Sequence, residues 1–513
     1  MTLLRESYLY QLCCTLLSLY EKSACHRLLC RAGRWCNAQI DESRVLRPLA
    51  REGVVAKAWG ESLLCRLLSF LLNLPGILLH KLYSALQQTF EGSFFARLAF
   101  SMGDSTAIAQ SWFILLLWII PYDYWNNAYT MVAFVLLLLL FYVGSMHRAD
   151  YRLDAKAIGF YPFLMLGAVF LGTVFSYAPG ESSRFFLYHL SAALCVLVTV
   201  SAVRCSRDLV RLVTGSSICV LVSAGYGIVQ RIQGVEVNTS YVDVRLNPDM
   251  PGRVMSFFDN PNTFAEVLIL LLPLVLALVL SAKKLWSKAF FALIFLMGAA
   301  ALAMTYSRAS WVGMACAMAV LVFLWKPRLI PAFLLLCLAA IPLLPDSIWN
   351  RILTIGNPAD TSTASRIPLV QAALAVIKRS PITGAGLGTS AVQAFIRDLS
   401  LYHGRAPYVH AHNFYIEVWV EAGILGLVGF LGSMLWNIKR CAHTVRRVCT
   451  QHSAARTITC AAAAALCGAM VCGLADYLWN YPRVLCIFWF VFAIALAGCK
   501  LCLQGDLEKE DYA

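Results

Sequence analysis

Long apolar runs separated by short polar connections dominate the chain from about residue 106 onwards. Most of these runs approach the roughly 20 residues that a helix needs to cross a bilayer. A bilayer core holds no water for exposed backbone groups, so such runs should be helical. Twelve of them predict membrane spans, at residues 107–121, 128–146, 158–178, 185–203, 209–230, 263–281, 286–305, 308–325, 329–345, 414–437, 457–477 and 483–502. The pattern predicts an all-α polytopic membrane protein of about twelve spans, with a large external loop between the ninth and the tenth.

The first 105 residues show a different pattern, of short amphipathic pieces rich in lysine and arginine. The apolar stretch 63–79 is an alternative span, but Asn73, Pro75 and its short length favour a helix that lies on the membrane. Apolar faces flanked by basic residues suit the surface of an anionic leaflet. We therefore expect a cytoplasmic membrane-surface region at 1–105, a transmembrane domain at 106–505 and a cytoplasmic tail at 506–513.

Composition supports a membrane protein and bears on its orientation. The chain is 60% apolar and 14% charged, with a formal charge of +14. Its lysines and arginines gather in the connections 145–157, 204–208, 282–288, 326–328 and 438–456, whereas 122–127, 179–184, 306–307 and 478–482 contain only Arg184. Basic connections mark the cytoplasmic side. Both termini are thus expected in the cytoplasm and the long segments 231–262 and 346–413 outside the cell, which makes nucleic acid an improbable partner.

One polar stretch leads directly into an apolar run. His410, His412 and Asn413 end the second long segment, and the run from 414 then carries Glu417 and Glu421. The spacing of Asn413, Glu417 and Glu421 is i, i+4, i+8, which aligns them on one helix face. Carboxylates at membrane depth normally face a protein interior or water. This face is therefore expected to open into a cavity.

Three more polar groups should lie at the same external end. Arg253 precedes Asn260 and Asn262 at the start of a span, where helix capping alone also explains the asparagines. Arg308 lies in a connection too short to leave the membrane boundary, where an arginine can also simply reach the headgroups. Arg366 opens a short amphipathic helix that ends before Pro381, and Gly384, Gly386 and Gly388 follow. These glycines support a flexible or phosphate-approaching loop but no dinucleotide fingerprint.

Histidine and arginine together at a membrane surface suggest a lipid pyrophosphate as substrate. A histidine can act as a base near neutral pH, and the arginine fork matches phosphate oxygens. His410 serves as readily as His412 on these grounds. The sequence contains no D-D-x-x-D cluster, Walker loop or apparent Ser-His-Asp arrangement. We expect no metal or other cofactor.

His412-Asn413, then nine residues, then Gly423-x-x-Gly426, resembles the H-[NSQ]-x9-G-x-x-G signature of the O-antigen ligase and polymerase superfamily. The resemblance extends over roughly 230–480, through 258–265, 305–313 and 365–388. It implies a type C glycosyltransferase-like fold and transfer of a glycan from polyprenyl (undecaprenyl) pyrophosphate to an acceptor hydroxyl of an envelope glycan or glycolipid. Leu427 stands where ligases prefer Gly, Thr or Tyr, so ligase and polymerase roles both stay open.

The resemblance also implies roles for individual residues. His412 would be the general base or would orient the acceptor, and Arg308 and Arg366 would bind the pyrophosphate. Asn413 and Glu417 would support His412, and Arg253 would be a weaker addition. The reaction would invert the anomeric centre at the outer face of the plasma membrane. A transporter or flippase of the same lipid is the alternative, since twelve spans with both termini inside are common among transporters.

Overall fold

The structure is a computed structural model, and it describes residues 53–238, 250–355, 365–402, 407–447 and 453–504, with scattered positions between 11 and 31. The expected tail at 506–513, most of the surface region before residue 53 and parts of both long polar segments lie outside the described residues. Within these ranges the chain is helical or in turns and loops, with no strand. The predicted all-α class is confirmed.

The helices follow the chain in an order close to the predicted one. They are α5 Val54–Glu61, α6 Leu63–Ala85, α7 Gln87–Gly92, α8 Phe94–Asp104, α9 Thr106–Ile119, α10 Ala128–His147, α11 Ala155–Ile158, α12 Phe160–Val174, α13 Pro179–Ala202, α14 Ser206–Gln233, α15 Pro261–Ser281, α16 Leu285–Met304, α17 Arg308–Trp325, α18 Ile330–Ala340, α19 Asp346–Leu353, α21 Arg366–Arg379, α22 Thr389–Asp398, α23 Phe414–Arg447, α24 Ala454–Cys472 and α25 Pro482–Gln504.

Ten helices of the described chain are long and apolar enough to cross a membrane, or eleven if α8 and α9, which meet at 71°, count as one broken span. Nine of the predicted spans are among the ten. The other three are shorter than expected: 107–121 corresponds to α9, 158–178 to the 15-residue α12, and 329–345 to the 11-residue α18 followed by a 3-10 turn. The protein is a multi-pass membrane protein, while the number of twelve stays a prediction.

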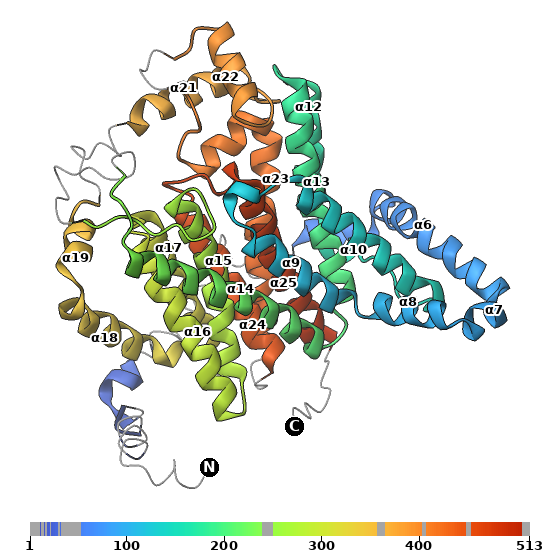
Figure 1. Ribbon diagram of the computed structural model, residues 1–513, viewed down its shortest axis with the longest axis horizontal. Helices are drawn as coiled ribbons and strands as arrows, with labels where there is room; N and C mark the ends of the chain where they lie inside the picture. The colour runs from blue at the N-terminus through green and yellow to red at the C-terminus, as the bar shows by residue number, and fades with distance from the viewer. Residues whose placement is uncertain are drawn as a thin grey trace.

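Helix α6 differs from the expectation for the N-terminal region. It runs unbroken for 23 residues through Pro75, and Ser62 caps it by accepting a hydrogen bond from Cys65 N. The prediction that the run is too short to span was therefore wrong, because the helix continues to Ala85. Asn73 is not a disruption either, since its amide donates to the carbonyl oxygens of Ser69 (2.8 Å) and Leu153 (3.0 Å). In Figure 1, α6, α7, α8 and α10 project together from one side of the molecule.

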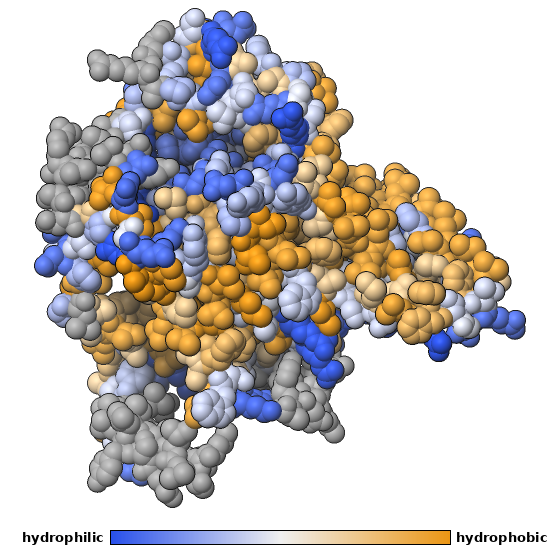
Figure 2. All heavy atoms as spheres, viewed as in Figure 1, coloured by the Kyte–Doolittle hydropathy of each residue, from blue (hydrophilic) through white to orange (hydrophobic). Residues whose placement is uncertain are grey.

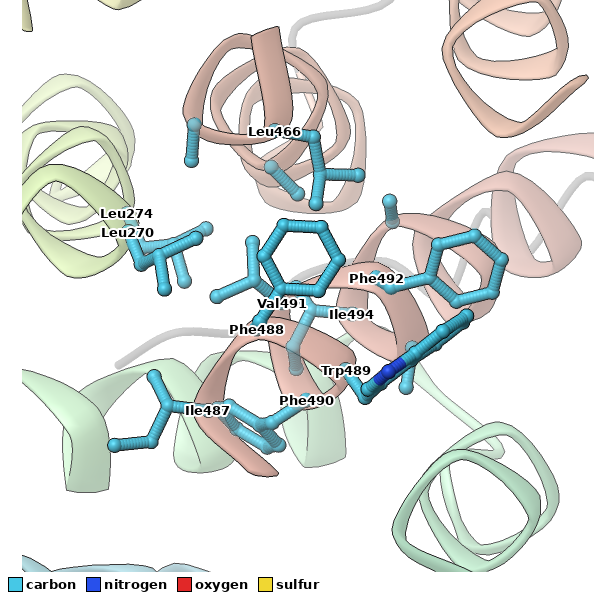
Figure 3. Close-up of a cluster of buried hydrophobic side chains, with 14 of the residues drawn as sticks. Leu270, Leu274, Leu466, Ile487, Phe488, Trp489, Phe490, Val491, Phe492 and Ile494 are labelled. Atoms are coloured by element: carbon cyan, nitrogen blue, oxygen red, sulfur yellow. The ribbon is translucent and has the colours of Figure 1, made fainter. Parts of the chain in front are cut away.

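Helix α25 lies at the centre of the bundle. Nearly all of it is buried, which fits a helix that is apolar on every face. Figure 3 shows Phe488 and Val491 of α25 close to Leu466 of α24 and to Leu270 and Leu274 of α15. Helices α15 and α24 are themselves largely buried. This core holds in place the ends of α15, α24 and α25, which carry several of the polar residues described below.

Polar surface gathers at one end of the bundle. Helices α21 and α22 lie there, at the top in Figure 1. Figure 2 shows a broad apolar belt around the molecule. Hydrophilic side chains lie between this belt and the end that carries α21 and α22. Helix α23 starts at this end and is interrupted by non-helical geometry at Gly423. The arrangement separates a polar end from a membrane-embedded body.

Candidate functional site

A cavity of about 270 Å³ opens at the end of the bundle where α17 begins and α24 ends. It joins segments that are far apart in the sequence: the loop before α15, the α16–α17 turn, α19, the start of α21 and the α24–α25 connection. Its polar and charged lining residues are Arg253, Asn262, Ser307, Arg308, Arg351, Arg366 and Asp476. The structure thus brings together four of the nine residues predicted from the sequence, and adds Arg351 and Asp476.

Four arginines and only one carboxylate, that of Asp476, line this cavity, so its lining carries a net positive charge. Arg253 is buried, and its Nε donates to the Thr305 carbonyl oxygen (2.6 Å) while its guanidinium also bonds the Asn262 side chain. Arg308 donates to the carbonyl oxygen (2.8 Å) and hydroxyl (3.1 Å) of Thr354, the residue that ends α19. Arg351 is buried on α19 itself. Guanidinium groups held in this way concentrate positive charge at the cavity, and an anion that binds there costs them little further conformational entropy.

The α16–α17 turn explains the position of Arg308. Helix α16 ends at Met304 and α17 begins at Arg308, so only three residues connect two membrane helices. Tyr306 in this turn has a φ of +52°, a left-handed conformation that is uncommon outside glycine. The Ser307 hydroxyl donates to Ser310 (2.9 Å) and so helps to fix the first turn of α17. The tight reversal keeps Arg308 at the boundary, as its spacing predicted.

His412 pairs with Asp476, which the sequence analysis missed. The Nδ1 of His412 lies 3.3 Å from the Asp476 carboxylate, and the other carboxylate oxygen accepts from the Asn262 side chain (3.1 Å). Burial raises the pKa of Asp476, but the hydrogen bond and charge of His412 and the charge of Arg366 outweigh this, so the pKa ends below its usual range. An ionised Asp476 accepts a hydrogen bond from the Nδ1–H of His412. The proton of the neutral imidazole then lies on Nδ1, and Nε2 is the basic nitrogen.

His410 has a different environment from His412. It is buried, and its Nδ1 accepts a hydrogen bond from the backbone N–H of His412 (3.1 Å). Burial lowers the pKa of His410 to about 3, so its imidazole is neutral at physiological pH. The His412 side chain keeps 28% of its surface exposed, and its backbone has a φ of +49°. The structure therefore favours His412 as the reactive histidine and His410 as a support for its backbone.

The three predicted asparagines separate into two kinds. Asn262 lies in the cavity lining and bridges Arg253 and Asp476. Asn260 caps α15 by accepting from Asn262 N, and Asn413 accepts from the backbone N–H groups of Tyr415 and Ile416 at the start of α23. Asn413 also donates to the Leu474 carbonyl oxygen (3.0 Å), which ties α23 to the connection that carries Asp476. Neither Asn260 nor Asn413 lines the cavity.

Glu417 and Glu421 do not face this cavity, so the expectation for that helix face was wrong. The Glu417 carboxylate accepts from the Tyr408 hydroxyl and the Ala411 N–H, both at 2.7 Å. Glu421 accepts from the Gly388 N–H (3.1 Å) and the Tyr477 hydroxyl (2.5 Å). Both carboxylates are buried and hold loops in place. The carboxylates satisfy backbone N–H groups that would otherwise be buried without a partner.

The glycine-rich loop packs against α23 and does not reach the cavity. Gly384, Gly386 and Gly388 all have positive φ, and a side chain at Gly384 would meet the backbone of Val420 and Glu421. The Ala385 N–H donates to the Val420 carbonyl oxygen (2.7 Å). The prediction of a phosphate-approaching loop was wrong for four of its backbone N–H groups, those of Gly384, Ala385, Leu387 and Gly388, because each donates to a protein atom.

His410, His412 and Asp476 bring one possible ligand atom each to within 4.8 Å of one another. They form a candidate metal-binding group in the described part of the chain. In this arrangement Nδ1 of His410 already accepts from the His412 N–H, and Nδ1 of His412 bonds Asp476. The nearby arginines also repel a cation. The group is therefore better suited to hold a proton than a metal ion.

Asp476 was missed because the span predicted at 457–477 included it, whereas α24 ends at Cys472. The signal that could have found it is that Asp476 is a carboxylate in a connection at the same end of the bundle as His412. Arg351 was missed because the long polar segment contains several arginines and nothing in the local pattern distinguishes this one.

The fold and the site define a multi-pass membrane protein with an arginine-lined cavity at one end of its helical bundle. Residues 292–431 match the sequence model of the family described as O-antigen ligase. This part, about a quarter of the chain, is thus similar to the O-antigen ligase family. The match includes Arg308, Arg366 and His412, and leaves Arg253 and Asp476 outside. No curated protein matches the chain significantly.

Proposed function

We propose that the protein transfers a glycan from a polyprenyl (undecaprenyl) pyrophosphate carrier to an acceptor hydroxyl of an envelope glycan or glycolipid. The observation that carries this proposal is the cavity with four arginines beside the His412–Asp476 pair. The reaction needs a site for a strongly anionic leaving group and a base for the incoming hydroxyl. Both requirements are met within one end of the bundle.

The arginines supply the site for the leaving group. When the bond from the sugar to the pyrophosphate breaks, negative charge develops on the phosphate oxygens. Arg308 and Arg366 would bind these oxygens, with Arg253 and Arg351 adding positive charge from the cavity wall. Fixed donors aimed at developing charge stabilise a transition state strongly, because they need no reorganisation during the reaction. With the charge met by guanidinium groups, no metal ion is required.

His412 would supply the base. Its Nδ1 pairs with Asp476, which leaves Nε2 to accept the proton of the acceptor hydroxyl. The oxygen would attack the anomeric carbon from the side opposite the pyrophosphate, so the configuration would invert. His410, Asn413 and Glu417 would act indirectly, by holding the 407–413 segment and the start of α23.

The positions of the polar groups favour a transferase over the transporter alternative. Transporters usually bind their substrate near the membrane midplane, between repeated halves. Here the arginines lie at helix ends and in connections. With the orientation inferred from the basic connections, this end faces outward and both termini are cytoplasmic.

The test is turnover of lipid-linked oligosaccharide by the purified full chain in nanodiscs. Arg366→Ala should lower the rate by about 10²–10³-fold, the usual effect of losing one transition-state donor. Arg379→Ala is the matched control, because Arg379 is exposed at the other end of the same helix. Addition of a chelator should leave the wild-type rate unchanged. Equal rates for both arginine variants would refute the role of the cavity, and loss of activity with the chelator would refute the metal-free mechanism.

A further inference from the structure

A second cavity, of about 620 Å³, lies at the opposite end of the bundle from the arginine cavity. Helix α25 connects the two ends, because it begins six residues after Asp476, which lines the arginine cavity, and reaches the second cavity at Lys500. At 1.5 Å per residue, the 18 residues from Pro482 to Lys500 span about 27 Å. The glycan-transfer site therefore does not extend into this cavity.

The lining of the second cavity is strongly basic. It includes five lysine or arginine side chains and two carboxylates: Lys57, Lys156, Lys439, Arg440, Lys500, Glu61 and Asp154. The Asp154 carboxylate is already used, since it caps α11 by accepting from Ala157 N (2.9 Å). Arg440 and Lys500 donate to backbone carbonyl oxygens, of Ala157 (2.8 Å) and Val200 (3.0 Å), rather than to carboxylates. The excess positive charge favours an anionic ligand.

Aromatic and apolar groups stand beside these charges. Arg440 lies over the ring of Trp436, 5.3 Å from its centroid. Val54 and Leu503 also line the cavity, and both are exposed. Tryptophan beside lysine and arginine is the usual composition of the membrane interface. A ligand with a phosphate group and an apolar body fits this combination better than a free ion does.

Helix α5 forms one wall of the cavity and is anchored to the bundle. Trp59 is buried, and its ring lies 5.3 Å from that of Phe163 and 5.9 Å from that of Phe160, centroid to centroid. Lys57 on α5 and Lys156 on α11 are both exposed. The wall is thus fixed by an aromatic contact, while these two lysines remain at the surface.

We propose that this cavity binds the phosphate headgroup of an anionic phospholipid, with α5, α11, α23 and α25 as its walls. Basic pockets between membrane helices recognise lipid headgroups in this way. The N-terminal region would then contribute directly to lipid recognition through α5. The proposal does not depend on the glycan-transfer function.

The experiment uses the full chain in nanodiscs of phosphatidylcholine mixed with phosphatidylglycerol, followed by native mass spectrometry of the lipids that stay bound. The Lys57→Gln/Lys156→Gln variant should retain about 30-fold less phosphatidylglycerol than wild type, given roughly 1 kcal/mol for each of the two basic residues near a lipid surface. The Lys284→Gln/Lys288→Gln variant removes two exposed lysines at the start of α16 and should retain as much as wild type.

Two results would overturn the proposal. The first is equal retention of phosphatidylglycerol by the cavity variant and the control variant. The second comes from inorganic phosphate added to the protein in pure phosphatidylcholine nanodiscs. If phosphate raises the thermal unfolding temperature and phosphatidylglycerol does not, the ligand is a free anion and the lipid assignment fails.

Discussion

At the scale of single residues, the chemistry depends on how His412 is held. Its φ of +49° is a conformation that costs about 1–3 kcal/mol in a non-glycine residue. The surrounding bonds offset this cost: His410 accepts from the His412 N–H, and the Phe414 N–H donates to the Gly473 carbonyl oxygen (2.7 Å). In this conformation Nδ1 of the imidazole lies 3.3 Å from the Asp476 carboxylate.

Replacement of Asp476 by asparagine tests this orientation. Asp476→Asn keeps the size of the side chain but removes the charge that selects the Nδ1–H form of His412. We expect kcat to fall by about 10²–10⁴-fold, the range attributed to general acid–base catalysis, with little change in KM for the lipid-linked donor.

The matched control is Asp398→Asn, which changes a carboxylate at the exposed end of α22. Steady-state kinetics in nanodiscs give both constants. A rise in KM at constant kcat for Asp476→Asn would contradict a positioning role and indicate a role in donor binding.

The sequence was sufficient to place those site residues whose position is fixed by the adjacent residues of the chain. Arg308 was placed at the boundary by a connection of very few residues, and His412 by the start of an apolar run. Arg351 and Asp476 could not be found in this way, because their positions depend on tertiary contacts between separate segments, such as the contact of Asp476 with His412, 64 residues away. Glu417 was expected to face away from lipid, and it is buried, but its partners Tyr408 and Ala411 were not predictable from helical periodicity.

At the scale of elements, the kink in α23 explains the first glycine of the signature. Gly423 has a φ of +67°, and a Cβ there would overlap the Ile382 carbonyl oxygen. Just past the kink, the Ile424 N–H donates to the Pro381 carbonyl oxygen (2.9 Å). The interruption thus allows the loop after α21 to dock on α23, which fixes Arg366 relative to His412.

Gly423→Ala should therefore destabilise the fold. We expect a loss of at least about 1–3 kcal/mol in the free energy of unfolding from the backbone conformation alone, with the overlap adding to it. Gly167→Ala is the control, since no atom lies within 4 Å of a Cβ at this exposed position of α12. Thermal unfolding in detergent measures both. An unchanged unfolding temperature for Gly423→Ala would contradict the docking role.

Helix existence was predictable and helix boundaries were less so. The apolar runs that became α15, α16, α17 and α25 were found because their length and composition leave few alternatives. Helix α6 was underestimated because Asn73, Pro75 and the short apolar run were counted against a span, whereas the helix continues through both residues to Ala85. The extra residues assigned to the end of α24 had the larger consequence, since they hid Asp476.

At the scale of the whole molecule, the two cavities lie at opposite ends of one helical bundle. The arginine cavity is formed by helix ends and connections, and the lysine-rich cavity by the distal parts of α23 and α25. The asymmetry of basic residues between the connections predicts that the lysine-rich end lies in the cytoplasm. This orientation would let the site meet lipid-linked glycans at the outer face.

Fusion of alkaline phosphatase, which needs an oxidising compartment for its disulfides, tests the orientation. A fusion after Ser400 should be active, and a fusion after Lys288 inactive, because these positions lie at opposite ends of the bundle. The reverse result would put the arginine cavity in the cytoplasm and would contradict transfer at the outer face.

The most direct measurement is mass spectrometry of lipid-linked and polymeric envelope glycans in cells that express wild-type protein, His412→Ala or His80→Ala at matched levels. His80 is the control because its imidazole lies on α6, outside the arginine cavity and the His412 segment. If His412 is the base, His412→Ala should accumulate polyprenyl-linked units and lose the polymer or conjugate, and His80→Ala should match wild type. Unchanged glycans in His412→Ala cells would contradict the proposed transferase.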